Sequence, residues 1–252
     1  MNVFFSTELA PCPYLEGRLE RRLVTGLAGS DADPRHDQLI RAGFRRSQGF
    51  AYRPACPGCQ ACLPVRIPVE RFSLGRTWRR VLKANADLAA AERDPVPTEE
   101  QFALFRRYLD GRHGDGGMAG MAFEDYSSMV ADSPVSSLVV EWRDPAGRLI
   151  AVSLTDRLLS GLSGVYKFFD PALARRSLGS LVILWHIARA RELGLPYVYL
   201  GYWIEDSPKM AYKARFTPLE RLGPDGWRPL ELVPSPKRVD PLPAARQDPN
   251  AA

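Results

Sequence analysis

Four cysteines are the residues best suited to chemistry, because three of them lie close together in the chain. Cys56, Cys59 and Cys62 form a C-x2-C-x2-C run, and Cys12 lies far upstream. This spacing lets two or three thiolates converge on one zinc ion, with Cys12 as a fourth ligand once the chain folds back. In iron–sulfur proteins a fourth cysteine usually follows closely, and none follows here. The spacing leaves two alternatives open: a structural zinc or iron–sulfur site, or unmetallated cysteines in a tight turn.

A second group with a defined spacing is basic. Its members follow i, i+3, i+4, i+7 spacing and are Arg76, Arg79, Arg80 and Lys83. They would share one face of an amphipathic helix, which the pattern predicts over 76–93. Rigidly spaced cations suit the phosphates of a nucleic acid, and Arg45 and Arg46 upstream favour the same interpretation. The alternative is a solvated surface helix.

A third candidate site is the start of the helix expected over 178–193. Arg175, Arg176 and Ser177 precede this helix, and Gly179 lies in its first turn. The free N–H groups and the dipole of a helix start attract phosphate, and a glycine permits close approach. The pattern is similar to the phosphate-cradling R/Q-x-x-G-x-G/A loop of the GNAT N-acetyltransferase superfamily, although Leu181 replaces the second glycine. The alternative is an ordinary helix N-cap with two surface arginines.

Several common catalytic motifs are absent from the sequence. There is no Walker A loop, no G-x-S-x-G elbow and no H-E-x-x-H. The three histidines are scattered, and His186 is interpreted as a packing or surface residue of a helix. An enzyme without these groups would act on an activated substrate, for which positioning and electrostatics suffice.

The elements that must position these residues follow from the hydrophobic periodicity. Strands are expected at 136–142, 149–155, 165–169, 197–202 and 227–232. Helices are expected at 98–110, 178–193 and 208–215, with Thr98 as an N-cap. The sequence therefore predicts an α+β fold, in which a small cysteine-bearing unit precedes a mixed sheet with flanking helices. We expect an N-terminal basic domain over 1–95, a second domain over 96–235 and a disordered proline-rich tail over 236–252.

Length and composition limit the classes of protein to consider. The chain has 252 residues, of which 45% are hydrophobic and 25% charged, so wholesale disorder is excluded. No apolar stretch is long enough to span a membrane and no signal peptide is recognisable, so we expect a cytoplasmic protein without a membrane partner. The net charge of +5 permits a nucleic-acid partner without requiring one.

Long motifs in both halves of the chain resemble the arginyl/leucyl-tRNA–protein transferases. They are R-A-G-F-R-R-S at 41–47, Y-R-P-x-C-x-x-C-x-x-C-x-P-x-R at 52–66, D-P-x-L-A-R-R-S-L-G at 170–179 and Y-L-G-Y-W-I-x-x-S-P-K-M-x-Y-K at 199–213. The likeness covers roughly residues 1–235. The segments C-P-Y-L at 12–15 and R-H-x-D-G-G-M at 112–118 look most like the bacterial aspartate/glutamate leucyltransferase branch.

The resemblance implies a GNAT-like C-terminal domain and the transfer of an aminoacyl group from tRNA to an acidic N-terminal residue. Leu-tRNA is the expected donor, with Arg-tRNA as the alternative, and the acceptors are proteins or peptides that begin with Asp or Glu. The product would be marked for degradation, with a proteolytic adaptor acting downstream. The chemistry needs no cofactor, because the aminoacyl ester is already activated. In eukaryotic relatives the N-terminal cysteines are linked to metal or iron–sulfur binding, but their arrangement differs from this one.

The resemblance also implies roles for particular residues. Lys209 and Lys213 are candidates for binding the acidic residue or the tRNA end. The candidates for lining the site or handling protons are Tyr199, Tyr202 and Tyr212, with Asp156 and Tyr166 on neighbouring strands. The helix start is expected to hold the tRNA 3′ end through Arg175, Arg176, Ser177 and Gly179. The tRNA phosphates are assigned to the basic helix face, Arg45 and Arg46.

Two functions of other classes remain as alternatives. A coenzyme A-dependent N-acetyltransferase would bind coenzyme A without tRNA, and the degraded glycine loop disfavours it. A non-catalytic tRNA-binding module would bind RNA but incorporate no amino acid, and the 199–215 segment disfavours that.

Overall fold

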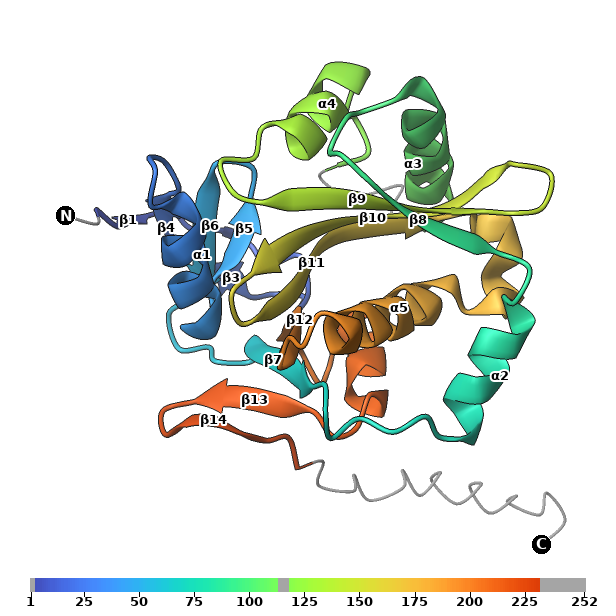
Figure 1. Cartoon of the computed structure of the whole chain (residues 1–252). Helices are drawn as coiled ribbons and strands as arrows, with labels where there is room; N and C mark the ends of the chain where they lie inside the picture. The colour runs from blue at the N-terminus through green and yellow to red at the C-terminus, as the bar shows by residue number, and fades with distance from the viewer. Residues whose placement is uncertain (1–2, 113–117, 232–252) are drawn as a thin grey trace, which may run out of the picture.

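The computed structural model describes residues 3–112 and 118–231. The tail expected over 236–252 and part of the 112–118 motif lie outside the described residues. The described chain is a mixed α+β fold, in which a large twisted sheet carries helices on both faces and a small N-terminal unit lies against one end (Figure 1). No helix in the described ranges combines the length and apolar composition needed to cross a membrane.

The large sheet contains eight described strands, and its core lies on the faces of β9, β10 and β11. In spatial order the strands are β14 (Gly226–Pro229), β13 (Glu220–Gly223), β7 (Leu63–Pro68), β12 (Tyr197–Trp203), β11 (Gly161–Phe169), β10 (Leu149–Leu158), β9 (Ser137–Arg143) and β8 (Ala89–Arg93). Neighbouring strands are antiparallel except β11 and β12, which are parallel and joined through a helix. The central strands expected from the hydrophobic runs correspond to β9, β10, β11 and β12.

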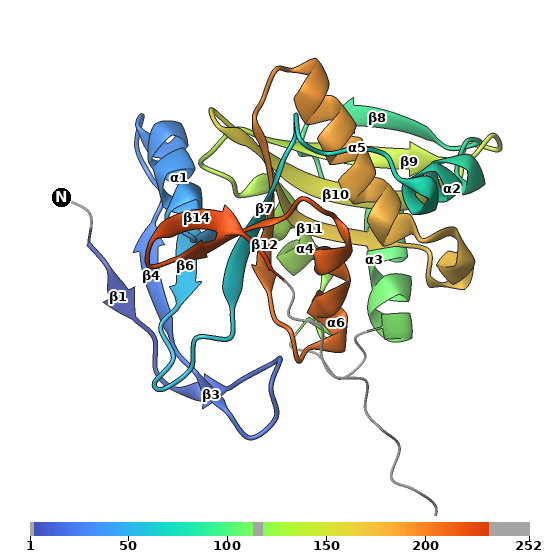
Figure 2. The ribbon, with the colours of Figure 1, turned by 90° about the horizontal axis from the view of Figure 1, so that it is seen from below.

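The helices form a layer on each face of this sheet (Figures 1 and 2). One face carries α3 (Glu99–Arg112) and α4 (Phe123–Ala131), and the other carries α2 (Arg76–Ala84) and α5 (Leu178–Glu192). The N-cap expected at Thr98 is confirmed, because its hydroxyl accepts a bond from the Gln101 N–H at 3.2 Å. Shorter elements flank the strands of the site: η1 (Pro171–Arg176), α6 (Pro208–Ala211) and η2 (Tyr212–Arg215).

The small N-terminal unit is a four-stranded antiparallel sheet with one helix, α1 (Ala32–Arg41). Its strands, in spatial order, are β1 (Phe5–Ser6), β4 (Arg22–Gly26), β6 (Phe50–Pro54) and β5 (Arg45–Ser47). A separate two-stranded ribbon, β2 (Ala10–Pro11) with β3 (Leu19–Glu20), continues the unit. Figures 1 and 2 place this unit and α2 at opposite ends of the large sheet.

The large sheet includes two strands that precede residue 95, where the boundary between the two domains is expected. Strands β7 and β8 precede that residue, yet β7 pairs with β12 and β8 pairs with β9. The helix expected over 76–93 ends at Ala84, because the Asn85 side chain bonds the Val81 carbonyl and 89–93 form the edge strand β8. The helix expectation rested on local spacing, and pairing with a distant strand overrode it beyond Ala84.

Candidate functional site

An opening between the parallel strands β11 and β12 is the central feature of the site. The two strands pair at three successive positions, which are Gly161–Tyr197, Leu162–Val198 and Ser163–Tyr199. Beyond Tyr199, β12 shifts register against β7, and Gly201 adopts a left-handed φ of 71° that favours glycine. The described strands therefore part after Tyr199, and backbone groups that would pair in a continuous sheet need other partners.

Two cations supply those partners. The Arg45 guanidinium donates to the carbonyl oxygens of Gly164 at 3.0 Å and Val165 at 2.9 Å on β11, and of Leu200 at 3.2 Å on β12. Lys213 Nζ donates to the Tyr202 carbonyl, two residues further along β12. The opening is thus held by side chains from two distant segments, β5 of the N-terminal unit and η2.

A third cation, Lys167, lies on β11 near the start of α5. Its Nζ donates to the Gly179 carbonyl at 2.9 Å and lies 5.3 Å from the ring centroid of Tyr212. The sequence-predicted residues Gly179, Tyr212 and Lys213 are therefore brought to one place. The motif analysis missed Lys167, because a lone lysine in a strand carries no spacing signal.

The charge at the opening is positive and uncompensated. In the described ranges, Arg45, Lys167 and Lys213 make no ion pair with a carboxylate. Lys213 is buried, and this burial, followed by Arg45 and Lys167, holds its pKa well below the usual lysine value. The arrangement suits a ligand that brings a negative charge, such as a carboxylate.

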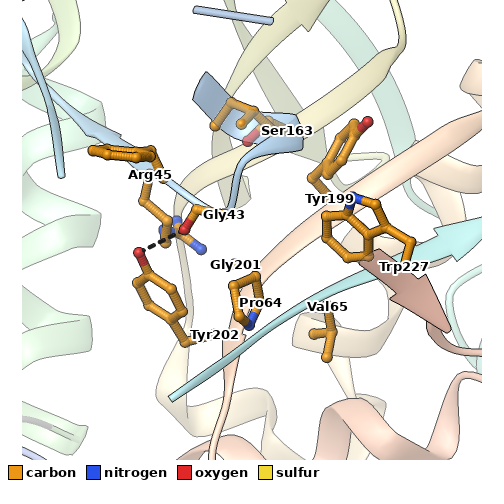
Figure 3. A pocket seen from close by; sticks show the side chains of 11 residues that line it. Gly43, Arg45, Pro64, Val65, Ser163, Tyr199, Gly201, Tyr202 and Trp227 are labelled. Carbon is orange, nitrogen blue, oxygen red and sulfur yellow. Dashed lines mark hydrogen bonds between the residues drawn. The ribbon is translucent and has the colours of Figure 1, made fainter. Parts of the chain in front are cut away.

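A small pocket lies on the side of the opening that faces the N-terminal unit (Figure 3). Arg45 and Tyr202 lie on one side of it, Tyr199 and Trp227 on the other, and Gly201 between them. Its cavity volume of about 10 Å³ holds roughly one water molecule. A peptide or an aminoacyl end would therefore need side chains here to move.

Two of the tyrosines predicted to handle protons are held in structural contacts. The Tyr202 hydroxyl donates to the Gly43 carbonyl at 2.9 Å (dashed in Figure 3) and lies 3.1 Å from the Tyr52 carbonyl. Burial, followed by Tyr52, raises the pKa of Tyr202, and burial also raises that of Tyr199. Tyr202 thus anchors β12 to the N-terminal unit, while the Tyr199 hydroxyl lies 2.9 Å from the hydroxyl of Ser160.

Asp156 and Arg46 are held together in a buried network away from solvent. The Asp156 carboxylate is completely buried and bonds Arg46 Nε at 2.8 Å, Arg46 Nη2 at 2.7 Å, His36 Nε2 at 2.9 Å and Ser137 Oγ at 2.8 Å. Arg46 is 4% exposed, so its guanidinium cannot reach a tRNA phosphate. This network instead joins α1 and β5 to β10, β9 and the large sheet. Arg45, half-buried and bonded to backbone carbonyls, does not present a free phosphate-binding surface either.

The remaining predicted residues lie around the opening or on the outer surface. Tyr166 is half-buried, packs edge-to-face against Phe105 at 5.9 Å, and burial raises its pKa. Lys209 is exposed on α6. His186, interpreted as a packing or surface residue, is buried with Nε2 2.8 Å from Thr155 Oγ1, and burial followed by Lys167 lowers its pKa to about 3.

The start of α5 is present, but its details differ from an ordinary N-cap. Ser177 has a left-handed φ of 54° and its side chain caps no N–H group. Arg176 Nε donates to the Asn85 side chain at 3.0 Å, and its guanidinium also pairs with Asp87. Arg175 is exposed. Arg176 is therefore tied to the loop after α2, and phosphate binding here stays a prediction.

The basic face of α2 is exposed as the spacing indicates. Its four cations, Arg76, Arg79, Arg80 and Lys83, form no ion pair within the described chain. An uncompensated cationic face of this kind is compatible with a polyanion and with solvent alike. Strand β5, which carries Arg45 and Arg46, lies at the other end of the molecule from α2 in Figure 1, so these two residues are not part of this face.

All four cysteines carry free thiols and are half-buried. Burial, followed by Cys12, Cys56 and Cys59, raises the pKa of Cys62 to about 12, so the four thiols influence one another. As the side chains are placed, however, no group of three or more potential ligands in the described ranges could hold a metal ion. A metal at the cysteines therefore stays a prediction, and no step of the chemistry is assigned to one.

Comparisons with known proteins cover nearly the whole chain. Residues 10–80 match the family described as arginine-tRNA-protein transferase, N terminus, and residues 100–223 match its C terminus. An aspartate/glutamate leucyltransferase of Paramagnetospirillum magneticum is 55% identical over 90% of this chain and 93% of its own. One from Gluconacetobacter diazotrophicus is 52% identical over 96% of this chain and 94% of its own.

A solved structure, L-PGS from Bacillus licheniformis, is similar with a TM-score of 0.45 and 11% identity, over 58% of this chain and 48% of that one. The two family matches together cover most of the N-terminal unit and the strands of the opening, and the C-terminal match includes residues 199–213. The chain therefore belongs to the aspartate/glutamate leucyltransferases of the arginine-tRNA-protein transferase family.

Proposed function

We propose that this chain transfers leucine from Leu-tRNA to the N-terminal Asp or Glu of acceptor proteins. The observation that carries this proposal is 55% identity to an aspartate/glutamate leucyltransferase over 90% of the chain. The lack of common nucleophile and metal-hydrolase motifs in the sequence agrees with a donor that is activated before it arrives.

The reaction needs little from the protein beyond alignment. The neutral α-amine of the acceptor attacks the ester carbonyl of Leu-tRNA, an amide N–C bond forms, and the C–O bond to the terminal ribose breaks. The ribose hydroxyl takes up the proton that the amine loses, so no redox partner or further substrate is consumed. Because an α-amino group has an ordinary pKa of about 7.7–8.0, a usable fraction is neutral near pH 7.5.

The cations of the opening support an acidic acceptor. Lys213, Arg45 and Lys167 lie there without a described carboxylate partner, so a bound Asp or Glu side chain would supply the missing negative charge. Lys209 is exposed on α6, four residues before Lys213, and is the second candidate for contact with the acceptor or the tRNA end. Tyr212 and Tyr166 would line the site beside them.

Other elements of the fold around this opening are suited to bind different parts of the tRNA. The parallel pair β11 and β12, joined through α5 and parting after Tyr199, fits a GNAT-like transferase domain. The α5 start, with Arg175, Ser177 and Gly179, would hold the tRNA 3′ end, and the α2 face would contact tRNA phosphates. A cytoplasmic location follows from the Leu-tRNA donor, and a proteolytic adaptor would recognise the new N-terminal leucine.

The cysteine cluster is proposed to be structural or regulatory, because an activated ester needs no thiol nucleophile. Elemental analysis of protein purified aerobically and anaerobically decides whether zinc or iron is bound. If neither metal is found, the four thiols serve packing alone.

A transfer assay tests the function directly. Radiolabelled Leu-tRNA and Arg-tRNA are each supplied with peptides that begin with Asp, Glu, Lys or Ala and are otherwise identical. We expect leucine on the Asp and Glu peptides only. Transfer from Arg-tRNA alone would identify an arginyl enzyme of the same mechanism, and tRNA binding without transfer would leave a binding module.

A further inference from the structure

Arg45 is the one residue of the N-terminal unit whose described side chain bonds both strands of the opening. Two of its bonds reach Gly164 and Val165 on β11, and one reaches Leu200 on β12. In a continuous parallel sheet, backbone N–H groups would hold these carbonyls. Here a guanidinium from another part of the chain does so instead.

The backbone of β12 is shaped to admit this side chain. A Cβ atom at Gly201 would lie 1.4 Å from Arg45 Nη1 and 2.4 Å from its Cζ, so no other residue type fits there while Arg45 keeps its position. Gly201 also has the positive φ that makes a side chain unfavourable. The glycine and the arginine therefore form one device, the Arg45 bridge, which consists of Arg45, Gly201 and the three carbonyls.

We propose that Arg45 is a positioning residue for aminoacyl transfer, and that its bridge sets the distance between β11 and β12 at the site of reaction. This inference rests on the proposed function. The next carbonyl along β12 that a cation holds is that of Tyr202, bonded by Lys213. A shift of β12 at Leu200 therefore moves the partner of Lys213 and the wall of the opening together.

The bridge also gives the N-terminal unit a part in the reaction. The adjacent Arg46 fastens β5 to β10 through Asp156, which fixes the origin of the Arg45 side chain. A planar guanidinium with five N–H groups can bond three carbonyls on two strands, whereas a lysine ammonium on a flexible stem presents a single charged centre. Arg45→Lys therefore keeps the charge and loses the bridge.

The first experiment compares Arg45→Lys with Arg53→Lys, a matched change at an exposed arginine of the neighbouring strand β6. Transfer is measured as kcat and KM for an Asp peptide, per molecule competent to bind tRNA, and tRNA affinity is measured across salt concentrations. We expect Arg45→Lys to lower kcat about 10- to 100-fold, as for a displacement of about 1 Å at a reacting site. Its tRNA affinity and salt dependence should stay at the wild-type values, and Arg53→Lys should resemble the wild type throughout.

The second experiment disrupts the Arg45 bridge by changing Gly201, the β12 residue against which the guanidinium lies. Gly201→Ala places a methyl group where Arg45 Nη1 lies, and Gly147→Ala imposes a similar strain at a φ of 82° with no atom within 4 Å of the new Cβ. We expect the loss in kcat with Gly201→Ala and not with Gly147→Ala. Combining Arg45→Lys with Gly201→Ala should add little to either alone, because both remove one device.

Hydrogen exchange supplies a readout that does not depend on activity. The amides of 164–166 and 200–202 should exchange faster in Arg45→Lys, whereas those of β9 should not change. A wild type that transfers neither leucine nor arginine would contradict the proposed function, and exchange would still test the bridge.

Three results would overturn the inference. Unchanged kcat per competent molecule in a folded Arg45→Lys variant would make the residue merely structural. A weaker tRNA affinity with a flatter salt dependence would make it a phosphate contact. Unchanged exchange at 164–166 and 200–202 would show that the two strands do not need it.

Discussion

Arg45 and Arg46 are neighbours on one strand, and the structure uses their identical charges in opposite ways. Successive side chains of a strand point to opposite faces, so the two guanidinium groups enter different environments. Arg46 meets the buried carboxylate of Asp156, with bonds of 2.8 and 2.7 Å. Arg45 meets backbone carbonyls only, in company with Lys167 and Lys213.

The difference separates a charge with a buried carboxylate partner from charges without a described one. The pair of Asp156 and Arg46 is internally neutral, is bonded further to His36 and Ser137, and leaves nothing for a ligand to satisfy. The cations at the opening have no described carboxylate partner, so under the proposed function a negatively charged ligand would balance them. We therefore expect changes at the two places to affect different measurements, stability at the first and transfer at the second.

The largest effect is expected from Asp156→Asn, which leaves the Arg46 cation buried without its counter-charge. Breaking one side of a buried ion pair costs about 3–5 kcal/mol. The free energy of unfolding in urea measures this loss. Transfer by the molecules that remain folded should stay near the wild-type rate, and a selective loss of kcat in fully folded protein would mean that Asp156 has a catalytic part after all.

The same residue gives an expected pH dependence. Burial raises the pKa of Asp156, but the bonds from His36 and Arg46 outweigh it and hold the pKa below the usual aspartate value. A carboxyl whose folded-state pKa is lowered stabilises the protein above its unfolded pKa of about 3.9, and that contribution disappears as the pH falls through the folded value. The gap in stability between wild type and Asp156→Asn should therefore narrow in acid.

Compared with Asp156→Asn, Lys213→Met should have the opposite effect: a large loss of transfer with little change in stability. Losing a charge-assisted contact with the acceptor carboxylate should lower transfer about 10- to 100-fold. Removing the buried amine should cost little, because relief from its desolvation offsets the donor that the Tyr202 carbonyl loses. Kinetics with Asp and Glu peptides, together with urea unfolding, measure both effects.

Lys209→Met is the matched control on the same segment. Lys209 is exposed, so its loss should reduce transfer less than that of Lys213. Because the folded protein lowers the pKa of Lys213, the buried lysine also predicts a pH dependence of stability. Burying the charged lysine lowers the free energy of unfolding, and this loss should shrink as the pH rises toward the ordinary lysine pKa of about 10.4. A Lys213→Met variant that transfers normally would show that the opening does not read the acceptor's charge.

Local patterns in the sequence predicted the central strands of the large sheet, but they missed β7, β8 and β13 and the connections between strands. The strands around Val139 and Val152 and the helix after Thr98 carry clear periodicity and caps, and all three are present. The placement of β7 and β8 in the large sheet depends on partners more than 40 residues away, which no local pattern encodes.

The candidate site shows the same limit. Lys213 and Tyr212 were predicted from one motif, but the separation of Arg45 from Arg46 follows from the face to which each side chain points. Two adjacent arginines look alike in a sequence, and only the register of β5 against β6 assigns one to Asp156 and the other to the opening. Lys167 has no motif around it, and its role depends on the approach of α5 to β11.

The smallest effect is expected at α2, where charge is uncompensated but fully solvated. Replacing Arg79 and Arg80 together by Gln should leave stability unchanged and weaken tRNA binding. Each phosphate contact contributes about 0.7–0.9 to the slope of log affinity against log salt, so losing two should flatten that slope by roughly 1.4–1.8. Turnover of tRNA that is bound should change little, because phosphate contacts orient the tRNA without touching the reacting ester.

A control of equal charge makes this last prediction specific to α2. Arg148→Gln with Arg228→Gln removes two exposed cations elsewhere, on the hairpin between β9 and β10 and on β14. If both double variants flatten the slope equally, general attraction by net charge accounts for it and α2 is no tRNA contact. If only the α2 variant does so, the surroundings separate three classes of charge: Arg46 is paired and buried, Arg45 is half-buried with no described carboxylate partner, and the α2 cations are unpaired and solvated.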